Sequence, residues 1–129
     1  MTERTITHTI ESDAQPDTIL SILADASRLP EWASAFADHV ERDGTSAWKV
    51  TKGGNAFALE VVVEPSSRTV DYLREIAPGI KGGAFLRVLP LPGGGSVVVM
   101  TLPVPPGQTT DAVAVILRQE LESLVTLSV

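Results

Sequence analysis

The feature that most constrains this chain is a series of six segments in which apolar and polar residues alternate with period two. The segments cover residues 37–43, 46–52, 56–64, 68–76, 83–90 and 96–103. Such alternation is typical of β-strands with one buried and one solvated face. Short turn sequences rich in Gly, Pro, Asn, Asp and Ser separate the segments, so each strand should return antiparallel beside the previous one. The pattern predicts an antiparallel meander.

Different patterns flank this meander. Residues 5–11 alternate and predict another strand, whereas residues 13–26 have a helical pattern with Pro16 in the first turn. A second short helix or turn is expected over residues 27–35. After "PVPPGQ", Thr109 or Thr110 should cap a last helix that ends near residue 127. With no linker, repeat or low-complexity tract, residues 1–129 are predicted to form one α+β domain.

Four stretches of the sequence resemble one family. They are "IESDAQPDTILSILAD", "RLPEW", "PLPGGGSVVVMTL" and "LRQELESLVTL". Together they are similar to the START/Bet v 1-like (SRPBCC) superfamily, in its polyketide cyclase/dehydrase-like branch, although Leu20 stands where the family often has Trp or Phe. The resemblance implies a helix-grip fold, in which a curved seven-stranded antiparallel sheet wraps around a long C-terminal helix and two short helices follow the first strand. It also implies a cavity between the sheet and that helix.

Composition argues against several classes of function. The net charge of −6 offers no basic surface for phosphates, so neither nucleic acid nor an anionic membrane is an expected partner. The chain has no Cys, and its two His lack helical His-x-x-x-His spacing, so we predict no metal site and no cofactor. No apolar run approaches the roughly 18 residues that span a bilayer, and the N-terminus is polar. We therefore expect a cytoplasmic protein without integral membrane association.

Trp32 stands in the turn "RLPEW", although the chain has only two Trp. A large ring there would fill the joint between the short helices and the sheet, because it buries more area than other side chains. Stacking on a ligand is the alternative.

Two polar residues fall on faces predicted to be apolar. Glu120 lies at the centre of the apolar stripe of the last helix, and His8 lies between Ile6 and Ile10. A buried carboxylate is costly unless it is solvated, paired or protonated. Glu120 could therefore reach water at a cavity mouth, pair inside the fold, or act on a ligand. His8 is either a core residue or a group that transfers protons.

Alternation also leaves two arginines undecided between faces. Tyr72 and Arg74 share one face of their strand, and Phe85 and Arg87 share one face of the next. An inward arginine would suit Glu120 or an anionic ligand. The candidate cavity residues are His8, Trp32, Trp48, Phe57, Tyr72, Arg74, Phe85, Arg87, Ile116 and Glu120. No catalytic residue is assigned.

Three functions fit these observations. The first is binding of a small hydrophobic molecule, such as a lipid, a polyketide or an aromatic metabolite. The second is an enzyme of the cyclase or dehydratase type, with Glu120 or His8 moving a proton on a bound substrate. The third is a non-catalytic interaction or regulatory module, and a homodimer is left open. Only the geometry of the site can decide between them.

Overall fold

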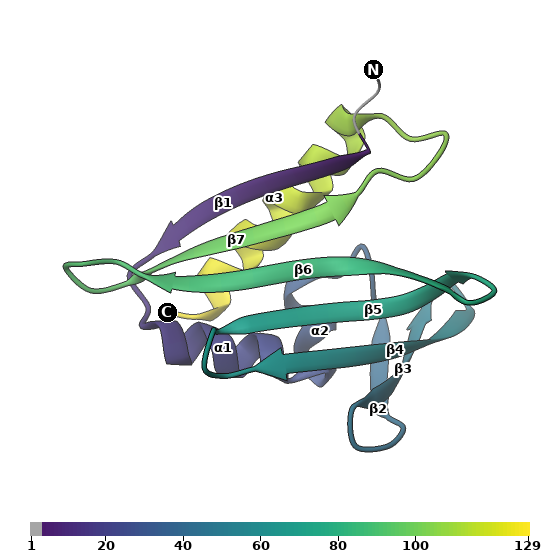
Figure 1. Cartoon of the computed structure of the whole chain (residues 1–129), viewed down its shortest axis with the longest axis horizontal. Helices are drawn as coiled ribbons and strands as arrows, with labels where there is room; N and C mark the ends of the chain where they lie inside the picture. The colour runs from purple at the N-terminus through teal and green to yellow at the C-terminus, as the bar shows by residue number, and fades with distance from the viewer. Residues whose placement is uncertain (1–3) are drawn as a thin grey trace.

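The computed structural model describes residues 4–129 and has one seven-stranded antiparallel sheet with the helices on one of its faces (Figure 1). The strands are β1 (Thr5–Ser12), β2 (His39–Arg42), β3 (Ala47–Lys52), β4 (Asn55–Glu64), β5 (Thr69–Ala77), β6 (Ile80–Pro90) and β7 (Ser96–Pro103). The helices are α1 (Pro16–Ala24), the short 3-10 helix η1 (Ala26–Arg28), α2 (Leu29–Trp32) and α3 (Thr110–Leu127).

The strand order is β1-β7-β6-β5-β4-β3-β2, and every neighbouring pair is antiparallel. Strands β2 to β7 form the predicted meander, and β1 adds to its end beside β7. In Figure 1, α3 lies behind β1 and β7, while α1 and α2 lie behind the other half of the sheet. The predicted fold is confirmed: a curved sheet grips a long C-terminal helix, and two short helical segments follow the first strand.

The predicted strand boundaries differ most at β6, which begins at Ile80 rather than at residue 83. The turn before it is very tight, because Ala77 already pairs with Ile80 and Gly79 adopts a φ of 74°. A positive φ of this kind favours glycine. Residues 80–82, including Gly82, therefore belong to the sheet together with Gly83, which the predicted strand already contained.

The core lies between the inner face of the sheet and the helices. Alternate strand residues point inward, and α3 contributes one apolar stripe. The most buried of these side chains are Ile19, Leu23, Leu29, Val50, Leu59, Val70, Val88, Val98, Leu117, Leu121 and Leu124. Each such side chain contributes roughly 1.5–3 kcal/mol when it leaves water. This aliphatic core holds α3 against the sheet.

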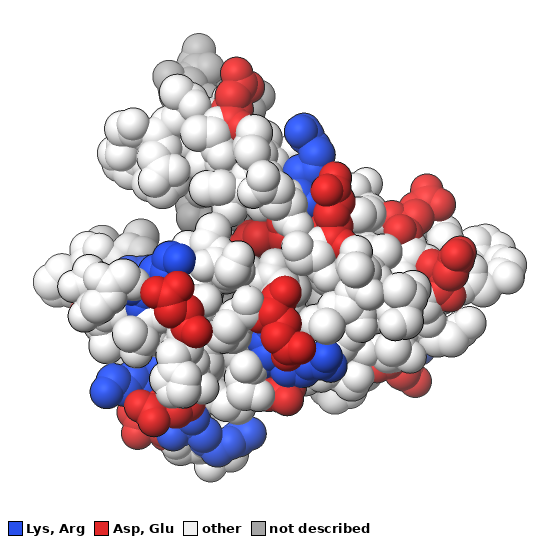
Figure 2. Space-filling model, turned by 180° about the vertical axis from the view of Figure 1, so that it is seen from behind, with Lys and Arg blue, Asp and Glu red and all other residues white. Residues whose placement is uncertain are grey.

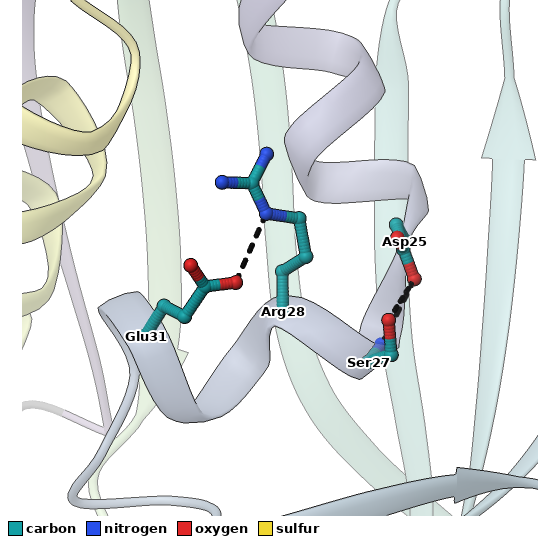
Figure 3. A network of polar contacts seen from close by, with 4 residues as sticks. All are labelled: Asp25, Ser27, Arg28 and Glu31. Atoms are coloured by element: carbon teal, nitrogen blue, oxygen red, sulfur yellow. Dashed lines mark hydrogen bonds and ion pairs between the residues drawn. The ribbon is translucent and has the colours of Figure 1, made fainter.

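Polar contacts fix the turn between α1 and α2 (Figure 3). The Ser27 backbone N–H donates to Asp25 Oδ1 at 3.1 Å, and the Ser27 hydroxyl donates to the same oxygen at 2.5 Å. Across the next helical turn, Arg28 Nε donates to Glu31 Oε2, three residues further on, at 3.0 Å. The first of these contacts caps the start of η1, because it satisfies a backbone N–H that a helix start leaves free, and the others join side chains. They hold the short helix that ends in Trp32.

Helix α3 begins as the sequence predicts. The Thr109 hydroxyl oxygen accepts a hydrogen bond from the Ala112 backbone N–H at 3.1 Å, and Asp111 lies in the first turn. An acid at this end interacts favourably with the helix dipole. Within residues 4–129, none of the helices combines the length and the apolar character that crossing a membrane requires.

Candidate functional site

A cavity of about 420 Å³ lies between the inner face of the sheet, α2 and α3. Mostly apolar side chains line it. The strands contribute Tyr72, Arg74, Ile76, Gly82, Gly83, Ala84, Met100, Leu102 and Pro103, the α2 region contributes Leu29, Trp32, Ala33, Ala35 and Phe36, and the last part of the chain contributes Pro105, Gln108, Val113, Ile116 and Glu120. Ile76 and Ile116 are 62% and 37% exposed, so the cavity opens to solvent beside them.

Small residues on β6 make room for the cavity. Across the ladder, Tyr72 pairs with Ala84 and Arg74 pairs with Gly82. Cross-strand partners lie on the same face of a sheet, so the space beside these two long side chains is left unfilled. Further along the same face, Leu86 and Val88 fill the core. The cavity is therefore confined to the end of the sheet near the β5–β6 turn.

The outer surface shows where the cavity opens. Figure 2 shows the helix side, which is hollowed between the lobe of the β7–α3 connection and the β5–β6 hairpin. Acidic and basic side chains are interspersed on this face, with uncharged surface between them. Along β5, exposure rises from 3% at Tyr72 to 62% at Ile76, with Arg74 half-buried between them. Tyr72 therefore marks the closed end of the cavity and Ile76 its mouth.

Trp32 forms part of the closed end. Its side chain is 2% exposed, and its ring centroid lies 6.1 Å from that of Tyr72 at an angle of 49°. The tilted arrangement is favourable for aromatic pairs. The ring thus fills the joint between α2 and the sheet, and it also lines the cavity. Its Nε1 is covered by protein and has no hydrogen-bond partner within residues 4–129.

Tyr72 connects β5 to the end of α1. Its hydroxyl donates to the Leu23 backbone carbonyl at 2.5 Å. Burial, and then the charges of Asp25 and Glu120, raise the pKa of Tyr72 far above its ordinary value. The hydroxyl therefore stays protonated and keeps this hydrogen bond.

Glu120 occupies the centre of the buried stripe of α3, as the sequence predicts. Val113, Leu117, Leu121 and Leu124 share this stripe, and Glu120 is 6% exposed. No cation lies within ion-pair distance of its carboxyl among residues 4–129. Burial raises the pKa of Glu120 from 4.5 to about 7. A pKa in this range suits a group that accepts or donates a proton near neutral pH.

Arg74 points inward but does not pair with Glu120. Its Cζ lies 3.9 Å from the ring centroid of Phe57, which in turn packs edge-on against Phe36 at 5.3 Å. Phe57 does not line the cavity, and its ring packs against the guanidinium. The contact is a cation–π interaction, which fixes the guanidinium partway between Tyr72 and the mouth.

The other candidate residues lie away from the cavity. His8 is half-buried on the inner face of β1, where α3 packs, and its Nε2 is covered without a partner among residues 4–129. Trp48 is buried on β3, where Arg42 Cζ lies 4.4 Å from its ring centroid. Phe85 and Arg87 are exposed on the outer face of β6, because Leu86 and Val88 take the inner face. The structure thus brings together five of the ten candidates: Trp32, Tyr72, Arg74, Ile116 and Glu120.

One side of the cavity comes from the connection between α2 and β2, which the sequence did not single out. Asp38 holds this connection: its carboxylate accepts from Lys52 Nζ at 3.0 Å and from the Gly53 backbone N–H at 2.9 Å. Lys52 Nζ also donates to the Ser34 carbonyl at 2.8 Å. The Gly53 contact, followed by that from Lys52, lowers the pKa of Asp38. The connection places Phe36 against the cavity.

Other lining residues were also missed, although the sequence carried a signal for some. Met100 and Leu102 continue the alternation of Val98 along β7 and could have been assigned to the inner face. Gly82 gave no such signal, since glycine usually indicates a turn, and Gly83 was predicted only as the first residue of a strand. Within the part of the chain that the structure describes, no group of three or more His, Asp or Glu side chains is arranged to hold a metal ion.

Comparisons with known proteins agree with this fold. No curated protein matches the chain. The aromatase/cyclase Zhui from a Streptomyces species is 18% identical, with a TM-score of 0.66 over 97% of this chain and 93% of that one. A START superfamily protein from Mycobacterium smegmatis is 18% identical, with a TM-score of 0.65 over 96% and 93%. The di-domain ARO/CYC protein BexL is 18% identical, with a TM-score of 0.73 over 96% of this chain but 46% of its own.

At these identities the structures establish the likeness of fold. The family follows from the sequence itself, because the pattern of the family described as polyketide cyclase/dehydrase and lipid transport matches residues 3–128. This chain belongs to that family.

Proposed function

We propose that this protein binds a small hydrophobic molecule in the cavity between the sheet and α3. The observation that carries this proposal is the cavity itself, which is about 420 Å³ in volume, mostly apolar and open at one end. Cavities of roughly 300–1,000 Å³ with a few polar groups are typical of small-molecule sites. The polyketide and lipid-transport description of the family supports the same class of ligand.

The volume limits the size of the ligand. At the packing density of protein interiors, a cavity of this size holds a molecule of about 15–20 non-hydrogen atoms. A two- or three-ring aromatic compound or a short lipid chain has this size. A longer chain would extend past Ile76 and Ile116 into solvent.

Fluorescence titration with the apolar dye N-phenylnaphthylamine tests the proposal. Ala84→Leu places a larger side chain on the inner face beside Tyr72 and should abolish dye binding. Ala58→Leu makes the same change at an exposed position of β4 and is the matched control. The proposal predicts saturable binding by wild type and Ala58→Leu only. Equal binding by Ala84→Leu, or no binding by folded wild type, contradicts it.

A cyclase or dehydratase activity is the second candidate, and Glu120 is the observation that favours it. A dehydratase needs an acid that protonates a departing hydroxyl, and a buried carboxyl with a pKa of about 7 can supply that proton. His8 does not line the cavity, so Glu120 would have to serve without it.

A linear poly-β-ketone is the substrate for testing this activity. The candidate predicts that wild type converts it to a cyclised, dehydrated product with an aromatic absorption band. Glu120→Gln keeps the shape of the side chain, removes the acid and should give none of this product above the uncatalysed rate. Equal conversion by both proteins, or by neither, argues against an enzyme that uses Glu120.

A further inference from the structure

At the closed end of the cavity, the described polar side chains are those of Tyr72, Trp32 and Glu120, and a ligand can reach only that of Glu120. Arg74 lies one inward position nearer the mouth on β5, and its Nε is covered by protein. The Tyr72 hydroxyl is already bonded to the Leu23 carbonyl. The Trp32 Nε1 is covered by protein atoms. The oxygens of Glu120 also lack a partner within residues 4–129, but they are not among the covered atoms, and Glu120 lines the cavity.

Water that enters the open cavity can meet the oxygens of Glu120. A ligand that displaces this water leaves the carboxyl without a partner unless the ligand supplies one, and a desolvated polar group without a partner is costly. We infer that Glu120, in its neutral form, donates a hydrogen bond to a carbonyl oxygen of the ligand. The cavity would then prefer neutral ketones, quinones or esters to hydrocarbons of the same size. This inference rests on the proposed function, since it names the class of ligand for the same cavity.

The surroundings of Glu120 favour a neutral acceptor over a cationic ligand. An amine would need the charged carboxylate, and burial opposes that form by raising the pKa of Glu120 to about 7. Arg74 lines the same cavity, and no carboxylate within residues 4–129 lies at ion-pair distance from it. Its positive charge would repel an entering amine. A carbonyl oxygen is compatible with both groups.

Other charged and titratable groups face α3 from the elements that pack against it. Tyr72 and Arg74 lie on β5, His8 lies on β1, and the Arg28–Glu31 pair lies at α2. Only Tyr72 and Arg74 of these line the cavity. His8 is a titratable side chain on an element that packs against α3, so any measurement of pH dependence needs a control at His8.

Two dyes of the same size separate a ligand that has a carbonyl group from one that lacks it. Prodan is a naphthyl ketone, and N-phenylnaphthylamine has no carbonyl and an equal number of non-hydrogen atoms. For prodan, we expect the dissociation constant to rise about tenfold between pH 6 and pH 8, because only protonated Glu120 donates the bond. For N-phenylnaphthylamine, the same change of pH should have less than about a threefold effect.

Three variants complete the test. Glu120→Gln donates at every pH, so its affinity for prodan should not depend on pH. Glu120→Leu cannot donate and should bind prodan at least about fivefold more weakly than wild type does at pH 6, with its affinity for N-phenylnaphthylamine retained. His8→Asn should keep the wild-type pH dependence. The inference is overturned if both dyes show the same pH dependence in wild type, or if the prodan dependence persists in Glu120→Gln. Failure of both dyes to bind folded wild type would instead overturn the proposed function.

Discussion

The hydroxyl of Tyr72 donates a hydrogen bond to the backbone carbonyl of Leu23, which lies 49 residues earlier in the chain. The bond joins the closed end of the cavity on β5 to the last turn of α1. The bond is buried, so if it is broken, bulk water cannot replace either partner.

Tyr72→Phe should therefore destabilise the fold by about 1–3 kcal/mol, since the Leu23 carbonyl would lose its partner while the aromatic ring stays in place. Urea denaturation followed by tryptophan fluorescence measures the change. Dye binding should persist in the folded variant, because the Tyr72 hydroxyl bonds to the Leu23 carbonyl and not to the ligand. A variant as stable as wild type would show that the bond contributes nothing.

Trp32 is expected to matter more for stability than for ligand recognition. Trp32→Ala removes a ring that is 98% buried and should cost about 3–5 kcal/mol, as truncation of large aromatic core residues does. Trp32→Phe keeps a ring and should cost clearly less. A loss below about 1 kcal/mol for Trp32→Ala, again from urea melts, would contradict the filling role of Trp32.

The two glycines of β6 should respond differently to the same substitution. A Cβ at Gly83 would lie 1.8 Å from the Tyr72 carbonyl oxygen, whereas a Cβ at Gly82 would first meet the Ile76 Cδ1 at 3.1 Å. Backbone cannot move aside without separating β5 from β6, but the exposed Ile76 side chain can rotate. We expect Gly83→Ala to cost about 2 kcal/mol or more in thermal or urea melts and Gly82→Ala to cost below about 1 kcal/mol. Similar melting of the two variants would show that β5 and β6 do not approach each other so closely at Gly83.

Glu120 should make stability depend on pH. The ordinary pKa of a glutamate, 4.5, applies to the unfolded chain, and burial in the folded protein raises the pKa of Glu120 to about 7. The folded protein therefore holds this proton more tightly than the unfolded chain does. The stabilising contribution of the neutral form is complete below pH 4.5 and disappears as the pH rises through 7, a loss of about 3 kcal/mol.

The matched variant for this prediction is Glu120→Gln, which has no proton to lose. Its free energy of unfolding, measured by urea melts from pH 4 to pH 8, should lack the decline of about 3 kcal/mol and exceed that of wild type most at the upper end. If both proteins follow the same curve, Glu120 is not desolvated in solution.

The fold could be predicted from the sequence more fully than the candidate site. Alternation located all seven strands, and Thr109 and Pro16 located two helix starts, because these signals are local. It also placed Glu120 on the buried stripe of α3. It could not assign Arg74 to the inner face and Arg87 to the outer face, since alternation within one strand does not say which face is covered.

The cavity itself was the hardest feature to predict. The cavity exists because Gly82 and Ala84 have no large side chain, and because strand pairing places them opposite Arg74 and Tyr72. Pairing register is a property of two strands and not of either sequence alone. His8 shows the same limit: its strand position suggested a cavity group, but it is on β1, the strand that packs against α3, and it does not line the cavity. A homodimer stays a prediction.

The crystal structure of the complex with N-phenylnaphthylamine tests the central claim most directly. We predict that the dye lies inside the cavity, in van der Waals contact with Tyr72, Ala84 and Ile116, with its far end toward the mouth at Ile76. A dye bound instead on the outer face of the sheet, for example over the exposed Phe85, with the cavity empty, would contradict it.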